Sequence, residues 1–502
     1  MLKDLRINNS LSGKKELFEP IHAPFVGMYV CGPTVYSDVH LGNARTFISF
    51  DVIYRYLMHL GYKVRYVRNI TDVGHLTNDE DSGEDKIGKK AKLENLEPME
   101  IVQRYTQDFH QVMELFNAKC PSIEPSATGH ILEQIEMIEQ LLANGLAYEV
   151  NGSVYFDVDA YQKNHDYGKL SGRKIDELIS NTRDLDGQDE KRNAVDFALW
   201  KNAEGTDHIM RWKSPWGEGF PGWHLECTVM GQKYLGKTFD IHGGGMDLKF
   251  PHHECELAQA LGANGEEPVK YWLHTNMLTV NGQKMSKSLG NSFLPHELFS
   301  GDHELLDRPY SPMTVRFFML QSHYASTLDF SNDALLAAQK GYRKLMNGLK
   351  TLRKLEETSQ PANQPTSQPV NEKVIGQING ICDNCYRAMN DDFNTALSIG
   401  HLFNLLKKIN SIYTQNLSIS EIGQETFDRI KETYEVFVLD ILALKEENNL
   451  EMEGLMNIVI DQYREAKESK NYDKVDQIRG KLKSQGVVLK DMKSGIDWAY
   501  EE

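Results

Sequence analysis

The stretch Met28-Tyr-Val-Cys-Gly-Pro-Thr-Val-Tyr-Ser-Asp-Val-His-Leu-Gly-Asn-Ala-Arg45 decides the fold of this chain of 502 residues. Met28 to Val30 is a short apolar run of strand character, and Gly32-Pro33 break the regular backbone after it. Beyond Asn43 the apolar residues recur at helical spacing, and Lys63 to Ile70 then reads as a second strand. Strand, helix and strand in this order predict a right-handed βαβ unit, because two parallel strands need a crossover connection.

Polar and thiol side chains follow the two predicted strands. In open parallel sheets, ligands bind outside the carboxyl ends of the strands. Cys31 follows the first strand and Thr71-Asp72 follow the second, so we expect them to lie together at that edge. His40 and Asn43 come at the start of the helix, where the backbone suits a phosphate group. The stretch therefore predicts a nucleotide site with a thiol beside it.

Composition limits the class of protein. A prior of roughly 150 residues per domain suggests about three domains. The formal net charge of −17 argues against indiscriminate binding to nucleic acid, although a local basic patch can still meet a specific RNA. Six scattered cysteines form no disulfide framework, the N-terminus lacks the apolar run of a signal peptide, and no stretch approaches the ~20 apolar residues of a membrane span. We therefore expect a cytoplasmic protein with no membrane partner.

Two further blocks carry residues typical of chemistry. Residues 219–256 contain the motifs Gly222-Trp-His-Leu-Glu-Cys227, His242-Gly-Gly-Gly-Met-Asp247 and Phe250-Pro-His-His-Glu-Cys-Glu256. In the last motif, His252 and Glu256 lie four residues apart on one helical face, close enough to hold a single ion. The second block, Leu278 to Ser288, is a strand that runs into an Asn-Gly turn and then a loop with two lysines and two serines.

The remaining chain predicts further helices, connected by polar segments. Val73 to Lys90 reads as a solvated loop, and the polar, proline-punctuated residues 356–371 read as a flexible link. The other expected elements are helices at 99–116, 131–142, 336–352, 373–412 and 421–445, and short strands at 154–158 and 487–489.

These motifs together resemble the cysteinyl-tRNA synthetase family of class I aminoacyl-tRNA synthetases. His40-Leu-Gly-Asn43 is similar to the family's His-Ile-Gly-His signature, with Asn43 in place of the second histidine, and Lys284-Met-Ser-Lys-Ser288 matches the second signature letter for letter. The similarity is strong to about residue 325. The motifs that narrow it to the cysteine enzymes are Cys-Gly-Pro-Thr-Val-Tyr at 31–36, Asn69-Ile-Thr-Asp72, Gly222-Trp-His-Leu-Glu-Cys227 and Phe250-Pro-His-His-Glu254, and the tail shares Met389-Asn-Asp-Asp-Phe-Asn-Thr395 and Gly486-Val-Val-Leu489.

The resemblance implies an α/β fold: a Rossmann-like parallel-sheet catalytic domain with an inserted connective domain, then an α-helical bundle and a small C-terminal α+β unit that binds the anticodon. The implied bounds are 1–120 and 193–275 for the catalytic domain, 121–192 for the insert, 276–325 for the Lys-Met-Ser-Lys-Ser loop and stem-contact region, 326–446 for the bundle and 447–502 for the C-terminal unit.

The implied activity is the activation of L-cysteine with ATP and Mg²⁺ to cysteinyl-adenylate and pyrophosphate, followed by transfer of cysteine to the 3′-terminal adenosine of tRNA(Cys). We expect a monomer with one Zn²⁺ per chain. Shape alone separates cysteine from serine by a few kcal/mol at most. Zinc binds a thiolate directly and has far less affinity for a neutral hydroxyl, so the metal would supply the selection and no editing domain would be needed.

The site residues follow from the same resemblance. The zinc ligands would be Cys31, Cys227, His252 and Glu256. The catalytic residues would be His40, Asn43, Lys284 and Lys287, and Gly42, Met285, Ser286 and Ser288 would also contact ATP. The substrate pocket would contain Gly32, Thr71, Trp223 and Asp247, with His224 and His253 as neighbours.

Several residues admit a second, structural interpretation. Cys255, at i+3 from His252, competes with Glu256 for the metal, but the family pattern selects Glu256 and makes Cys255 a packing residue. Cys382 and Cys385 resemble half a zinc knuckle, and two packed thiols one helical turn apart is the better interpretation. Trp498 either stacks on an anticodon base, with Asp491 accepting hydrogen bonds from a base edge, or closes a small core.

Two other functions remain open at this point. One is an ATP-dependent ligase that joins cysteine to a small amine, which shares the catalytic domain but has a shortened end. The other is a zinc-binding or RNA-binding relative without catalysis, against which the intact His40, Lys284 and Lys287 argue.

Overall fold

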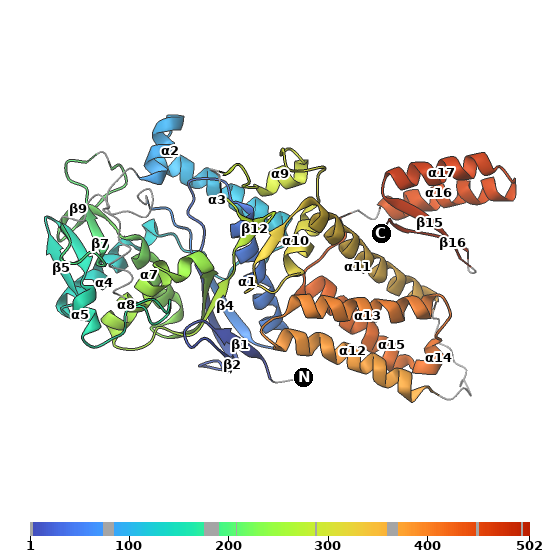
Figure 1. Ribbon diagram of the computed structural model, residues 1–502, viewed down its shortest axis with the longest axis horizontal. Helices are drawn as coiled ribbons and strands as arrows, with labels where there is room; N and C mark the ends of the chain where they lie inside the picture. The colour runs from blue at the N-terminus through green and yellow to red at the C-terminus, as the bar shows by residue number, and fades with distance from the viewer. Residues whose placement is uncertain are drawn as a thin grey trace.

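A four-stranded parallel sheet forms the centre of the computed structural model (Figure 1), with the strand order β11-β10-β3-β4. The structure describes residues 4–73, 85–174, 190–206, 208–286, 289–358, 370–447, 451–492 and 495–501. The strands are β3 (Phe25–Val30), β4 (Lys63–Arg68), β10 (Phe239–Gly245) and β11 (Val269–Thr275), and helix α1 (Leu41–His59) connects the first two. The predicted βαβ unit and the Rossmann-like fold are therefore confirmed.

The two faces of this sheet are covered by different helices. Successive side chains of a strand point to opposite faces. Met28 and Val30 accordingly belong to the apolar core that contains α1, whereas Tyr29 and Cys31 belong to a second core. The second core is formed with α4 (Ile131–Ala143), α7 (Trp223–Leu235) and α8 (His252–Asn264). This alternation puts the Cys31 thiol on the side of α7 and α8.

The insert is built on a five-stranded antiparallel sheet, which extends beyond the expected end at residue 192. Its order is β5 (Ala147–Val150), β6 (Ser153–Phe156), β7 (Phe197–Asn202), β9 (Gly217–Pro221) and β8 (Trp212–Ser214). The apolar run at 195–200, expected to return to the catalytic domain, instead pairs with β6, Tyr155 opposite Ala198. The bound of 192 is therefore corrected to about 221.

A second correction concerns the loop expected at 73–90. Residues 74–84 lie outside the described residues, but α2 (Lys86–Glu94) already begins at Lys86. The carboxylate of Asp85 accepts hydrogen bonds from the amides of Ile87 and Gly88, and such a cap stabilises the first turn of a helix. The helices α3 (Pro98–Leu115) and α4 confirm two predictions.

The predicted turn after Leu278 is also present. Asn281 and Gly282 have positive φ angles of 49° and 77° and connect β12 (Leu278–Val280) to β13 (Gln283–Lys284). The other neighbour of β12 is β14 (Leu328–Phe330), which runs parallel to it. The elements between them include α9 (Pro295–Ser300) and α10 (Pro312–Leu320).

The second half of the chain is helical, as predicted. Its helices are α11 (Asn332–Thr358), α12 (Glu372–Asn390), α13 (Thr395–Tyr413), α14 (Ile419–Ile422) and α15 (Gln424–Glu435), followed by a π-helical segment at Val436–Ile441. Cys382 and Cys385 are both fully buried in α12 and pack in its apolar core, which confirms the packing interpretation. Most of the expected link, residues 359–369, lies outside the described residues. None of the helices in the described ranges is long and apolar enough to span a membrane.

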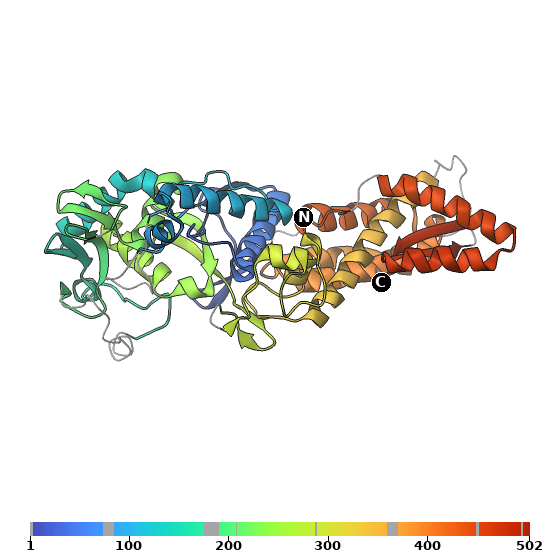
Figure 2. The same ribbon diagram turned by 90° about the horizontal axis from the view of Figure 1, so that it is seen from above.

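The C-terminal unit has helices α16 (Glu451–Glu468) and α17 (Tyr472–Ser484) and a hairpin of β15 (Val487–Met492) and β16 (Gly495–Tyr500). The predicted strand at 487–489 is thus confirmed. Both views show an elongated molecule, with the insert at one end and this unit at the other (Figures 1 and 2).

Trp498 lies inside the small core of this unit. Its side chain is 4% exposed and packs with Met456, Ile460 and Val487. The Lys350 ammonium of α11 lies 2.9 Å from the centre of its ring. The structure therefore supports the second interpretation, in which Trp498 closes a small core, because too little of the indole is exposed for an anticodon base to stack on it.

Candidate metal and nucleotide site

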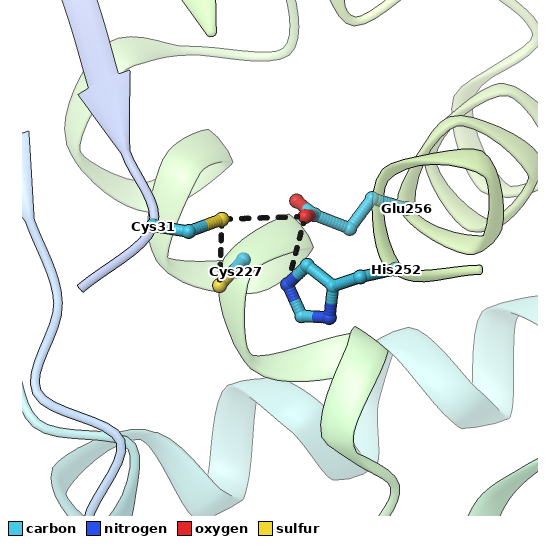
Figure 3. A group of neighbouring side chains, drawn as sticks. All are labelled: Cys31, Cys227, His252 and Glu256. Carbon is cyan, nitrogen blue, oxygen red and sulfur yellow. Dashed lines mark hydrogen bonds and ion pairs between the residues drawn. The ribbon is translucent and has the colours of Figure 1, made fainter. Parts of the chain in front are cut away.

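Four buried side chains from three elements point toward one another beside the central sheet (Figure 3). The Cys31 Sγ atom lies 3.6 Å from the Cys227 Sγ atom and 3.6 Å from the Glu256 Oε1 atom, and His252 Nε2 lies 3.1 Å from the same oxygen. One potential ligand atom from each residue lies within 4.8 Å of the other three. We call these four residues the metal group, because two sulfurs, one nitrogen and one oxygen can hold a single ion.

The fold positions each member for a local reason. Cys31 is the first residue after β3, at the edge of the sheet where ligands bind. Cys227 lies one turn into α7, and His252 and Glu256 lie one turn apart at the start of α8. The structure brings these four residues together, as predicted. Their binding of a metal stays a prediction.

Cys255 does not belong to the metal group. It is buried, and its sulfur lies 3.3 Å from the hydroxyl of Tyr167, which is part of the insert. It lies one residue before Glu256 on α8 and is in neither of the groups of potential metal ligands found among the described residues. Cys255 is therefore a packing residue, as predicted.

The sequence analysis missed the role of His242. This residue lies in β10, and its Nε2 atom is 2.9 Å from Glu256 Oε2, the carboxylate oxygen that faces away from His252. His253 also lies beside the metal group, with its Nε2 atom 3.3 Å from Cys31 Sγ and 3.9 Å from Glu256 Oε1. Cys31, His242, His253 and Glu256 consequently form a second, overlapping group of potential ligands. In the sequence His242 stood out only as the first residue of the motif His242-Gly-Gly-Gly-Met-Asp247, which gave it no role.

His253 is the end of a chain of polar contacts that runs through His274 to Ser10. Its Nδ1 atom lies 2.8 Å from His274 Nε2, and His274 Nδ1 lies 2.8 Å from the hydroxyl of Ser10. Burial, followed by the neighbouring cations, lowers the pKa of both histidines, that of His274 to about 3. Both rings are therefore neutral at pH 7 and can accept or donate a hydrogen bond without adding charge.

The charges of the metal group are set by its own members and by His242. Burial raises the pKa of Glu256, but His242 and His252 outweigh it and lower that pKa to about 2. Burial lowers the pKa of His252, but Glu256 and Cys227 outweigh it and raise it to about 10. Burial also raises the pKa of Cys227, yet the hydrogen bond from Cys31 and the charge of His252 bring it to about 7. Burial raises the pKa of Cys31 well above its ordinary value, so Cys227 is the more acidic of the two thiols.

Three of the four predicted substrate residues lie next to the metal group. Trp223 is half-buried, and its ring centre is 4.7 Å from that of His252. The amide of Gly32 donates to Asn69 Oδ1 at 2.8 Å, and the Asn69 side chain donates to the hydroxyl of Thr71 at 2.9 Å.

That hydroxyl in turn donates to the buried carboxylate of Glu226 at 3.1 Å. Asp247 is exposed, in a short 3₁₀ segment (Met246–Lys249) that follows β10. The roles of the four residues in substrate binding stay predictions.

The predicted nucleotide residues gather at the N-terminus of α1. His40 is the N-cap, and its Nδ1 atom accepts a hydrogen bond from the amide of Asn43 at 3.3 Å. The β12–β13 hairpin lies against this turn, since a Cβ atom on Gly42 would come within 3.2 Å of Met285 Cε. Lys284 is exposed at the end of the hairpin. Lys287 and Ser288 lie outside the described residues, and Ser286 is the last residue before them.

This arrangement has the parts needed to bind a polyphosphate. A helix N-terminus presents backbone amides and a positive dipole end to an anion. The hairpin brings at least one lysine to the same place, so that positive charge approaches from two directions. One member of the metal group, Cys31, lies nine residues before the N-cap His40, at the end of β3.

Comparison with known proteins agrees with this geometry. Residues 17–340 match the family model for the catalytic domain of class I tRNA synthetases (C), and residues 384–442 match the model of the DALR domain.

Curated relatives match along the whole chain. A cysteine–tRNA ligase of Cytophaga hutchinsonii is 60% identical over 499 residues, which are 99% of each chain. Those of Bacteroides thetaiotaomicron and Chlorobaculum tepidum are 54% and 44% identical and cover 99% and 100% of both chains.

A solved structure shares the fold. The Mycobacterium tuberculosis methionyl-tRNA synthetase in complex with methionyl-adenylate is 15% identical, with a TM-score of 0.57, and the match covers 84% of this chain and 90% of that one.

Proposed function

The chain belongs to the cysteine–tRNA ligase family of class I tRNA synthetases, and from this we propose that it activates L-cysteine with ATP and transfers it to tRNA(Cys). The observation that carries the proposal is that one loop, from the end of β3 to the start of α1, links the metal group, which has two thiols, an imidazole and a carboxylate, to a helix N-terminus suited to a polyphosphate. The relatives match over nearly the whole length, including the C-terminal part of the chain, whereas a small-amine ligase would have a shortened end.

The four residues of the metal group fit Zn²⁺. Two sulfurs, a nitrogen and an oxygen within 4.8 Å of one another are the donor types and the spacing that this ion takes. A zinc ion held by Cys31, Cys227, His252 and Glu256 would supply a direct bond to the thiolate of cysteine, which serine cannot make. The overlapping group with His242 and His253 has one sulfur fewer, so we assign those two imidazoles to holding Glu256 and Cys31 in place.

The other predicted residues act on the reacting carboxylate and the triphosphate. The first turn of α1, capped by His40, would hold the phosphates, with Gly42 offering its backbone amide and Asn43 its side-chain amide. Lys284 and Lys287 would neutralise the negative charge that develops on the departing pyrophosphate. Trp223 would form a wall of the amino-acid pocket, and Thr71 and Asp247 would orient the cysteine.

The test has two stages. The purified chain is assayed for ATP–pyrophosphate exchange with each amino acid and Mg²⁺, and then for charging of tRNA(Cys). We expect exchange with cysteine alone and charging of this tRNA. Cysteine-dependent exchange without any charging would instead support the small-amine ligase, and no exchange with cysteine would refute the proposal.

A further inference from the structure

Arg45 is a buried cation at the joint between α1 and the β12–β14 sheet. It lies on the second turn of α1, two residues after Asn43, and its side chain is 1% exposed. All four of its hydrogen bonds within the described residues go to main-chain carbonyls rather than to a carboxylate. A buried guanidinium with this many carbonyl partners is a structural clamp, because each N–H group fixes the position of one peptide.

The four carbonyls belong to two separate chain segments. Nη1 donates to the carbonyls of Asn276 at 2.9 Å and Met277 at 2.7 Å, in the segment that enters β12. Nη2 donates to the carbonyls of His323 at 3.3 Å and Ser326 at 2.5 Å, in the segment that enters β14. β12 and β14 then run parallel, with Leu278 opposite Leu328. One side chain of α1 therefore fixes the start of both strands.

The contacts of Arg45 fix the positions of the two segments proposed to bind ATP relative to each other. α1 begins at the N-cap His40, and β12 continues through its turn into β13, which carries Lys284. Arg45 lies near the start of α1 and contacts the two residues just before β12. A displacement of the strands against α1 at this point would move the lysine loop relative to the helix N-terminus, and misplacement of about 1 Å can cost roughly 10²-fold in rate.

We propose that Arg45 is a positioning residue for the activation step, which docks the lysine-bearing hairpin onto the helix that holds the phosphates. The inference rests on the proposed function and adds a residue to it. Lysine cannot replace arginine in this role, because a compact ammonium on a single stem lacks the planar fork that reaches two segments at once.

The experiment compares Arg45→Lys with Arg316→Lys in the full-length chain. Arg316 is an equally buried arginine that donates to the carbonyls of Leu442 and Phe116 and to Asp51, at 2.7, 2.8 and 2.6 Å, and none of these partners lies in the β12–β14 sheet. We expect both variants to lower the unfolding midpoint. Only Arg45→Lys should lower kcat of cysteine-dependent pyrophosphate exchange, by about tenfold or more.

Two further readouts separate positioning from a general loss of structure. In Arg45→Lys, the zinc content and the KM for cysteine should stay within about twofold of the values of the wild-type protein. Hydrogen exchange should increase at the amides of β12 and β14. Equal losses of kcat in both arginine variants, or a loss of zinc and of cysteine affinity together with kcat, would overturn the proposal.

A second variant covers the case in which Arg45→Lys does not fold. The side chain of Asn276 donates to the Ala325 carbonyl at 3.0 Å and so links the same two segments without Arg45. Asn276→Ala should lower kcat in the same sense but less, and an unchanged kcat there would refute the inference. Absence of cysteine-dependent exchange in the unchanged chain would refute the proposed function itself.

Discussion

Gly32 lies so close to Asn69 that no side chain fits between the two residues. A Cβ atom on Gly32 would come within 1.6 Å of the Asn69 carbonyl oxygen, and the Gly32 amide donates to Asn69 Oδ1 at 2.8 Å. The same Oδ1 atom accepts from the Cys227 thiol at 3.7 Å. One asparagine therefore sets the separation between the strand end that carries Cys31 and the helix that carries Cys227.

Gly32→Ala should disrupt the metal group. The added methyl group meets backbone rather than a flexible side chain, so the end of β3 has to move, and Cys31 moves with it. We expect reduced zinc content and a loss of cysteine-dependent exchange of roughly 10²-fold. The control is Gly400→Ala on the exposed side of α13, where a Cβ atom meets nothing within 4 Å and a gain in stability of about 0.5–1 kcal/mol is expected. Normal zinc content in Gly32→Ala would contradict this prediction.

Cys227→Ser should show which of the two overlapping groups of potential ligands binds zinc, because only one of them contains Cys227. If zinc is bound by the metal group, loss of the Cys227 thiolate removes a ligand, and elemental analysis should find well under one zinc per chain. His242→Gln removes only the partner of Glu256, and we expect a loss of zinc affinity of roughly 10–100-fold while the stoichiometry at excess zinc stays near one.

Two buried cysteines outside the metal group are the controls. Cys255→Ser and Cys382→Ser should keep their zinc. Full zinc occupancy in Cys227→Ser, with loss of the ion in His242→Gln, would transfer the site to the group of Cys31, His242, His253 and Glu256.

The parts of the site that could be predicted from sequence are those set by local geometry. His252 and Glu256 share a helix face because they are four residues apart, and Cys31 lies at the edge of the sheet because it follows a strand directly. His242 was missed because its relation to Glu256 depends on how far β10 runs beside α8, a packing detail that no spacing reveals. Arg45 gave no signal either, since a charged residue within an amphipathic helix is usually solvated.

The errors in the fold have similar causes. The strand β7 was assigned to the catalytic domain because a buried apolar run reads the same in either sheet, and only its pairing with β6 decides. The role of Trp498 was left open because the core that encloses it is completed by Lys350, about 150 residues away in the chain.

Lys287→Ala should lower the rate of pyrophosphate exchange far more than it weakens the binding of cysteine. Negative charge builds on the departing pyrophosphate in the transition state, so a lysine that meets it there contributes to kcat rather than to ground-state affinity. A decrease of about 10²-fold or more in kcat is expected, with cysteine binding measured separately by calorimetry. Lys490→Ala, which changes an exposed lysine of the C-terminal hairpin, is the matched control. Near-normal exchange in Lys287→Ala would show that the loop takes no part in activation.

Asp497 should hold the C-terminal unit against the helical bundle. It pairs with Lys354 of α11 and accepts from the Tyr413 hydroxyl of α13 at 2.7 Å. Burial raises the pKa of this carboxyl, but Lys354 and Tyr413 outweigh it and keep it below its ordinary value. A lowered pKa in the folded state means that this contact stabilises docking above about pH 3.9, and that the contribution is lost as the pH falls through the lowered value.

Asp497→Asn should therefore loosen the unit already at pH 7, seen as faster hydrogen exchange along β16. The control is Asp491→Asn, because the partners of Asp491 in the described part of the chain, Lys467 and Arg479 among them, belong to its own unit. Equal hydrogen exchange of β16 in the two variants would contradict a docking role for Asp497.

Removal of residues 450–502 should abolish charging and spare activation. The unit touches the rest of the chain along α11, where Arg343, Asn347 and Lys350 donate to the carbonyls of Glu501, Tyr500 and Trp498, far from the metal group. Cysteine-dependent pyrophosphate exchange should consequently stay within about twofold, because the hydrogen bonds of this unit to the rest of the described chain go to α11 and α13 and not to the proposed ATP segments. The tRNA, in contrast, must be held across the length of the molecule, and an acidic protein needs a local group of cations to do so. Lys470, Lys474 and Lys481 lie exposed on or beside α17 and can supply that charge. If the truncated chain charged tRNA(Cys) with unchanged efficiency, recognition of the tRNA would rest on the bundle and catalytic domain alone.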